Sequence, residues 1–117
     1  MAQDWARPVV HWELIARDPE AQAEFYRKMF GWAIGDGDLK VVPAGLGAPE
    51  PGPAGHIMGG DQPGFALYIQ VRDLKASLAL AAELGGSVNS DPFDVPGGPT
   101  IAFMADPEGN RLTLVQQ

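Results

Sequence analysis

The chain contains no cysteine among its 117 residues. This absence excludes disulfide bonds, thiolate nucleophiles, zinc–thiolate sites and iron–sulfur clusters. It also favours a cytoplasmic location, because disulfides are typical of oxidising compartments. The first residues, from Met1 to Trp5, lack the basic and apolar regions of a secretory signal, which supports the same expectation.

Basic residues and long apolar runs are also scarce. Lys and Arg number 8 against 15 Asp and Glu, which gives a net charge of −7. A surface of this sign repels phosphate backbones and anionic lipids. No apolar run approaches the roughly 18 residues that are needed to cross a bilayer. We therefore expect no nucleic-acid partner and no membrane partner, and a small organic ligand or substrate instead.

The sequence predicts the same order of elements twice. A strand over 9–16 precedes a helix that Asp18 caps and Gly31 ends, and a strand over 65–71 precedes a helix that Asp73 caps and Gly86 ends. One shift aligns both caps (73 − 18 = 55) and both glycines (86 − 31 = 55). After each helix we expect about three strands, over 32–34, 39–42 and 56–58 in the first half and over 87–89, 101–104 and 111–115 in the second.

This repeat predicts an α+β fold with two βαβββ modules, over 9–59 and 65–117, in a single domain of residues 1–117. Each module is too small to hide its own apolar face, so the two are expected to pack together around an open cleft or partial barrel. Strand alternation predicts that the helices cover the outer faces of the sheets through Trp12, Leu14, Leu67 and Ile69.

The opposite strand faces carry the candidate site. His11 and Glu13 lie two residues apart on one strand, so both side chains project to the same side. The corresponding strand of the second half presents Tyr68 and Gln70, and the last strand presents Thr113. A pocket with apolar walls and a few polar groups is the usual form of a small-molecule site. We therefore expect these five side chains to line a ligand-binding cleft.

Several motifs resemble the vicinal oxygen chelate superfamily, which includes glyoxalase I, bleomycin-resistance proteins and extradiol dioxygenases. His11 seven residues before Asp18-Pro19, followed by Phe30-Gly31-Trp32, is similar to its first module. The second module is matched by Leu84-Gly85-Gly86 and the turn from Asp106 to Asn110. The resemblance spans nearly the whole chain and implies the paired-module fold. Because this fold carries several chemistries, it leaves the activity open.

The resemblance also implies four positions where related enzymes hold a metal. In this chain they are His11, Met58, Ala66 and Thr113, of which only His11 is a usual ligand. The leading hypothesis is therefore a small-molecule-binding protein of the glyoxalase and bleomycin-resistance type without the usual metal site and without a cofactor. Its catalytic residues, if it is an enzyme, are not assigned.

Other hypotheses stay open at this point. His11, Glu13 and His56 together would supply two histidines and one carboxylate, a set that holds one divalent metal in some enzymes, here a lyase, isomerase or dioxygenase. His11 and Glu13 could also act without metal as an acid–base pair. A purely partner-binding role is the third alternative. The resemblance and the exposed module edges further predict a homodimer.

Overall fold

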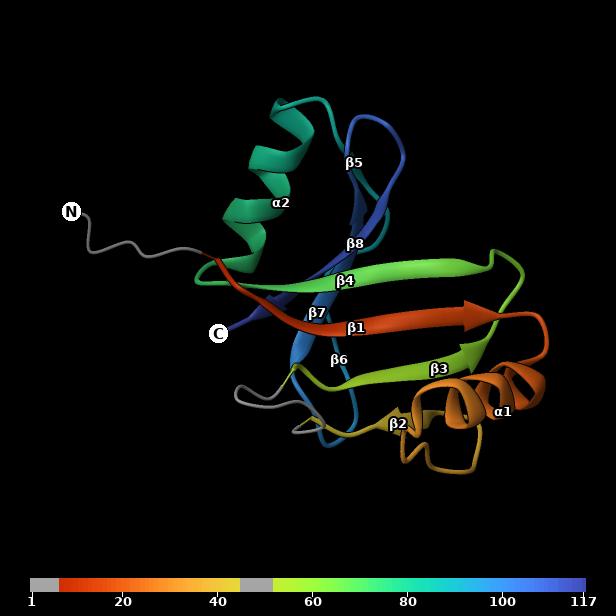
Figure 1. The fold of residues 1–117 in the computed structure, drawn as a ribbon. Coiled ribbons are helices and arrows are strands. Elements are labelled where there is room, and N and C mark those ends of the chain that lie inside the picture. Colours follow the sequence, from red (N-terminus) through yellow and green to blue (C-terminus); the bar gives the residue numbers. More distant parts are fainter. Residues whose placement is uncertain (1–6, 45–51) are drawn as a thin grey trace. The chain divides into compact units, whose positions relative to one another are not determined.

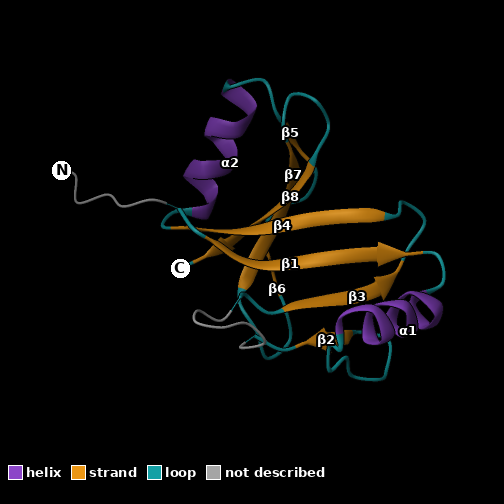
Figure 2. Ribbon diagram, in the orientation of Figure 1, coloured by secondary structure: helices purple, strands orange, loops and turns teal. Residues whose placement is uncertain are grey.

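The computed structural model describes residues 7–44 and 52–117. These residues form two helices and eight strands, which Figures 1 and 2 show as one strand–helix–strands series following another. They divide into two compact units, His11–Phe65 and a second that joins Ala66–Gln117 to the residues before His11. The predicted α+β class is confirmed. In place of the three strands expected after each helix, the described residues form two strands after the first helix and four after the second.

The first unit contains most of β1 (Val9–Ala16) and all of α1 (Pro19–Phe30), β2 (Lys40–Val42) and β3 (Gly55–Gly59). β3 pairs in parallel with β1 on one side and antiparallel with β2 on the other. Helix α1 follows β1 and packs against β3. The parallel pairing is what brings residues from the start of the chain beside residues some 45 positions later.

One face of β1 builds the core of this unit. Leu14 and Ala16 are buried together with Ala23 of α1 and Ile57 of β3, and Trp12 packs against the same cluster. These β1 residues alternate with His11, Glu13 and Ile15, so the apolar face meets the helix and the other face carries the polar side chains. The predicted role of Trp12 and Leu14 beneath the helix is confirmed.

The ends of α1 also follow the sequence. The Asp18 carboxylate accepts a hydrogen bond from the backbone N–H of Ala21, and Pro19 occupies the first turn, where a missing N–H costs nothing. At the other end Gly31 has a φ of 72°, a left-handed conformation that glycine adopts without strain.

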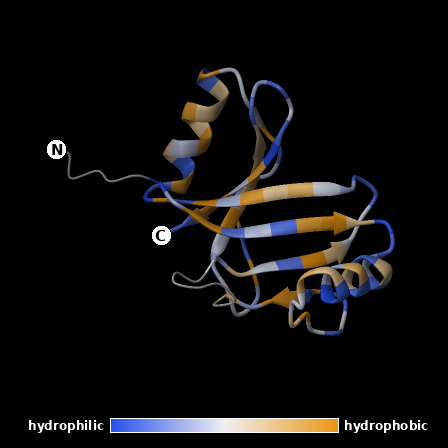
Figure 3. Ribbon diagram, in the orientation of Figure 1, coloured by the Kyte–Doolittle hydropathy of each residue, from blue (hydrophilic) through white to orange (hydrophobic). Residues whose placement is uncertain are grey.

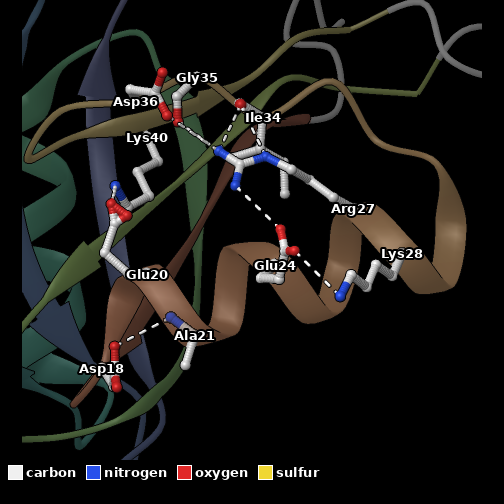
Figure 4. Close-up of polar contacts among 10 residues, drawn as sticks. All are labelled: Asp18, Glu20, Ala21, Glu24, Arg27, Lys28, Ile34, Gly35, Asp36 and Lys40. Carbon is white, nitrogen blue, oxygen red and sulfur yellow. Dashed lines mark hydrogen bonds and ion pairs between the residues drawn. The ribbon is translucent and has the colours of Figure 1, made fainter.

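A predicted strand over residues 32–34 is absent, and the reason lies in Arg27. Its Nη2 donates to the carbonyl oxygens of Ile34 and Gly35 at 2.9 and 3.3 Å, and its Nε donates to Ile34 at 3.2 Å. Figure 4 shows the guanidinium reaching this turn from α1. Because the helix side chain takes up the carbonyl of Ile34, the segment is held by side-chain hydrogen bonds, and the described part of this unit has two strands after its helix.

The second unit contains most of β4 (Gly64–Val71) and all of α2 (Leu74–Glu83), β5 (Ser87–Val88), β6 (Phe93–Asp94), β7 (Thr100–Ala105) and β8 (Arg111–Gln116). β4 pairs in parallel with β8, β8 pairs antiparallel with β7, and β7 also pairs with β5 and β6. Its core joins Val71, Leu74, Leu78, Ala102 and Leu114.

The expected contacts of β4 with α2 are only partly present. Ile69 packs against the core that contains Leu74 and Leu78 of α2, as predicted. Leu67, two residues earlier on the same face, is 42% exposed, so the prediction that it lies beneath the helix is wrong. The helix is 10 residues long and covers only the end of β4 that leads into it.

Across residues 7–44 and 52–117, neither helix has the length and apolar content that a membrane crossing requires.

Candidate functional site

His11, His56 and Glu13 form a continuous hydrogen-bonded chain in the first unit. His11 Nε2 lies 2.8 Å from His56 Nδ1, and His56 Nε2 lies 2.9 Å from Glu13 Oε2. The two imidazole rings are stacked, with centroids 5.0 Å apart and an angle of 29° between their planes. The middle residue, His56, therefore uses both of its ring nitrogens, one toward each neighbour.

The sheet register explains why these three residues meet. β1 alternates, so His11 and Glu13 lie on the face opposite α1. The parallel pairing places His56 directly beside Glu13 and Gly55 beside Trp12. Figure 3 shows a hydrophilic stretch in both β1 and β3, followed in each strand by a hydrophobic stretch. The alternation along β1 therefore places His11 and Glu13 on one face, and the pairing of β1 with β3 adds His56.

Two of these three hydrogen-bonded residues are buried. Glu13 is 9% exposed and His56 is 5% exposed, whereas His11 is only half-buried. Partial burial lowers the pKa of His11, and the neighbouring His56 lowers it further, while the carboxylate of Glu13 raises it. Loss of water around a ring disfavours its charged form. The accessible end of the chain is therefore a histidine that favours its neutral form.

The second unit holds the other predicted ligand-binding residues. Tyr68 lies beside Thr113 in the register of β4 and β8, and Gln70 lies two residues further along the same face. Thr113 is buried, and Tyr68 and Gln70 are partly buried. The structure thus brings these three side chains onto one sheet face, opposite the face that packs against α2. That they share a cleft with His11 and Glu13 stays a prediction.

The donor atoms do not form a three-ligand metal site as arranged. The two ring nitrogens of His56 point in different directions, one toward His11 and the other toward Glu13. A metal ion bound to one of these nitrogens would therefore not be bound by all three residues in the present geometry. Within the described ranges no three His, Asp or Glu side chains converge in a way that suits a metal. Structural metal sites usually need three or four protein ligands in a defined geometry.

A charged group that the sequence analysis missed lies in the first unit. The side chain of Lys40 on β2 is only 3% exposed, and its ammonium donates to Glu20 Oε1 at 2.8 Å and to the carbonyl of Gly37 at 2.9 Å. Figure 4 shows Lys40 and Glu20 side by side at the start of α1. Both line a cavity of about 480 Å³ that also includes Met58 and Gly59. A lysine on a short strand normally reads as a solvated residue, so only the fold reveals its burial.

The match to a family model decides the relationship of this chain. The model of a glyoxalase-like domain matches residues 9–115. The chain belongs to the glyoxalase-like domain family. A glyoxylase-like domain-containing protein of Didymella fabae is 32% identical over 112 residues, which cover 87% of this chain and 88% of that protein.

Longer curated relatives share the same level of identity. The anthracycline biosynthesis protein DauV of Streptomyces sp. (strain C5) is 32% identical over 113 residues, which cover 89% of this chain and 39% of the relative. A putative glyoxylase, CFP32 of Mycobacterium bovis, is 27% identical, with 42% of its length covered. The glyoxalase-like chain thus spans about two-fifths of the length of these relatives.

Solved structures confirm the fold that the resemblance implies. A glyoxalase/bleomycin resistance protein/dioxygenase superfamily member from Vibrio splendidus matches with a TM-score of 0.67 at 13% identity, covering 96% of this chain and all of the other. Methylmalonyl-CoA epimerase from Mycobacterium tuberculosis matches with a TM-score of 0.65 at 16% identity, covering 99% and 91% of the two chains. Together with the family-model match, they confirm the predicted resemblance to the glyoxalase superfamily.

Proposed function

We propose that this glyoxalase-like domain binds a small organic ligand without a metal at the family positions. The observation that carries this proposal is the hydrogen-bonded chain of Glu13, His56 and His11, which is buried at its carboxylate end and half-buried at its histidine end. Buried polar groups in proteins normally have hydrogen-bond partners, whether or not they bind a ligand. A chain that ends in a partly accessible imidazole also offers a hydrogen-bonding group to a ligand.

The rest of the proposed site comes from the second unit, where Tyr68, Gln70 and Thr113 share a sheet face. A phenol hydroxyl, a primary amide and an alcohol can each donate and accept hydrogen bonds, so together they suit a ligand with several oxygen atoms. Two curated relatives are named for anthracycline biosynthesis, which makes anthracyclines a first ligand class to test.

Thermal unfolding in the presence of a small-molecule panel that includes anthracyclines tests this function. A ligand of the site raises the melting temperature of the native chain, because it binds the folded state only. His11→Phe should abolish the shift, and substitution of the exposed Gln62 by Ala should preserve it. A panel in which no compound changes the melting temperature would contradict the proposal.

The alternative is a metal-dependent lyase, isomerase or dioxygenase that uses His11, Glu13 and His56. The contiguity of these three side chains favours it, although the hydrogen-bonded arrangement does not present three ligands to one ion. Elemental analysis of protein purified without chelator and without a metal-binding tag distinguishes the two functions. About one equivalent of iron, manganese, nickel or zinc per chain would support the alternative. Protein that stays metal-free after incubation with these ions would support the organic-ligand site.

We also propose that the chain associates with a second copy of itself. Helix α1 exposes Phe25, Met29 and Phe30, and the side chain of Met29 is 62% exposed. Large exposed apolar clusters are uncommon on monomers and often mark a protein–protein contact. The exposed Leu80 on α2 and Leu84, the residue that caps its end, stand 55 positions after Phe25 and Met29, so an apolar pair recurs at both helices (80 − 25 = 55, 84 − 29 = 55). The curated relatives that are more than twice as long have room for a second domain of this kind within one chain.

A further inference from the structure

Lys40 is a buried cation of the first unit that the proposed function does not use. Its side chain is 3% exposed, and its ammonium donates to Glu20 Oε1 at 2.8 Å and to the carbonyl oxygen of Gly37 at 2.9 Å. Figure 4 shows the ammonium meeting the carboxylate of Glu20. Among the described residues these are its two acceptors, whereas an ammonium has three N–H groups. One donor is therefore left to bind water or a ligand.

Strand alternation places this cation away from His56. Lys40 lies in register with Ile57, a residue of the core beneath α1, whereas the next β2 residue, Val41, lies in register with His56. Successive side chains of a strand point to opposite faces of the sheet, so Lys40 and His56 lie on opposite faces. A ligand held by Lys40 would therefore occupy a site separate from the one that contains His56.

A cavity of about 480 Å³ lies beside Lys40, and its size falls within the range of roughly 300–1,000 Å³ that small-molecule sites usually have. Pro19 and Met58 line it and supply apolar surface, while Glu20 and Asp38 supply two carboxylates. Both acidic residues are exposed, in contrast to Lys40. The cavity thus combines one buried cation with two anions, a total charge of −1 (1 − 2 = −1).

We propose that this cavity binds a small zwitterion, such as a free amino acid, whose carboxylate accepts from Lys40 and whose ammonium faces Glu20 and Asp38. A buried ammonium is costly without partners, and an ionised carboxylate is among the strongest acceptors that a ligand can offer it. A ligand with a carboxylate alone would be repelled by Glu20 and Asp38. A ligand with an amine alone would bring a second cation beside Lys40. A zwitterion meets both requirements.

Titration calorimetry with three leucine compounds tests the ligand class. Leucine carries both charges, leucinamide lacks the carboxylate, N-acetylleucine lacks the ammonium, and all three have the same apolar side chain. At about pH 6.5, below the usual pKa of an α-amino group, leucine should bind at least about tenfold more tightly than either derivative, the equivalent of one hydrogen bond to a charged group. No heat of binding with millimolar leucine, or equal binding of the three compounds, would overturn the proposal.

Two charge variants with matched controls locate the ligand. Lys40→Met removes the ammonium and keeps the apolar stem, so it should abolish leucine binding, whereas Lys28→Met, at a side chain that is 76% exposed, should not. Asp38→Asn should weaken binding several-fold, and Asp36→Asn, at a carboxylate that is 96% exposed, should leave it unchanged. Leucine binding that survives in folded Lys40→Met protein would overturn the proposal, because the ligand would then lie elsewhere.

A variant that fills the cavity tests the site without removing any charge. Gly59 lines the cavity, and a Cβ at this position would meet Pro19 Cγ at 3.5 Å, an ordinary van der Waals contact, so Gly59→Val should fold and should block leucine. Gly52→Val is the control, since a Cβ there meets no atom within 4 Å. Unchanged leucine binding in Gly59→Val would contradict the proposed site. Ligands that depend on His11 should bind this variant normally, so the two proposals can fail separately.

Discussion

The indole of Trp12 lies directly over Gly55, the residue with which it is paired in the parallel register of β1 and β3. A Cβ atom at position 55 would overlap Cε2 and Cδ2 of the indole, so only glycine fits beneath the ring. The next pair along the strands is Glu13 with His56. The close packing of one pair of residues therefore supports the register on which the neighbouring hydrogen bonds depend.

We expect Gly55→Ala to reduce the free energy of unfolding by about 1–3 kcal/mol, because the indole must move to admit the methyl group. Urea denaturation followed by tryptophan fluorescence measures the loss. Gly52→Ala is the matched control, since a Cβ at that position meets no atom within 4 Å. Equal effects of the two substitutions would show that the indole does not need the space above Gly55.

His11 should make the stability depend on pH. Its pKa in the folded protein is lowered below the ordinary value of 6.5, first by burial and then by the charge of His56, against a raising effect of Glu13. The unfolded chain therefore binds more protons at this position than the folded chain between the two pKa values. Stability should fall as the pH drops below about 6.5 and level off once the pH is below the folded pKa.

Urea denaturation across pH 5–8 measures this dependence, and His11→Gln provides the comparison. The substitution removes the titrating ring, so the decline below pH 6.5 should become shallower. A variant with the same pH dependence as the native chain would assign the effect to another group.

Removing Glu20 should destabilise the protein more than removing the charge of its ion-pair partner, Lys40. Removing the carboxylate with Glu20→Ala leaves a buried ammonium that the Gly37 carbonyl still partners, and we expect a loss of about 1–2 kcal/mol, limited by the exposure of Glu20. Lys40→Met removes the charge and keeps the apolar stem, so it should cost less.

A double-mutant cycle by urea denaturation tests this asymmetry. Glu20→Ala should have little effect in the Lys40→Met background, because no buried ammonium remains to lose its partner. Glu24→Ala, on the exposed face of the same helix and paired with Lys28 at 3.3 Å, is the control and should cost a few tenths of a kcal/mol. Additive losses in the cycle would mean that Lys40 and Glu20 are not coupled.

Helix α1 should determine the oligomeric state. Light scattering at micromolar concentration should give the mass of two chains for the native protein. Met29→Glu should shift the equilibrium toward one chain, because a charge would be buried in the contact. The surface substitution Lys28→Glu is the control for an added carboxylate on the same helix. A monomeric native protein would contradict the proposed association.

The sequence predicted much of the fold from local signals. The caps at Asp18 and Asp73, the alternation in β1 and the repeat of 55 residues are short-range patterns that strong local preferences enforce, and the structure bears them out. The missing strand over 32–34 and the exposed Leu67 were not predictable in this way. Both depend on what another element does: Arg27 takes the carbonyls of one segment, and α2 is too short to cover the other.

Some residues of the candidate site were likewise predictable from local sequence, and others were not. His11 and Glu13 were identifiable because they lie two residues apart on one strand. His56 shares their face through a pairing of strands that are distant in sequence, and its place between the other two is visible only in the structure. Lys40 gave no signal, because its neighbours in sequence resemble those of a solvated lysine.

Glu13, His56 and His11 all belong to the unit His11–Phe65, and none of their mutual hydrogen bonds needs the second unit. These three hydrogen-bonded residues therefore belong together to one module. A duplication, fusion or exchange of modules between chains would carry these hydrogen bonds along intact. In a family with members more than twice as long as this chain, these three residues could be retained together while the rest of the protein changes.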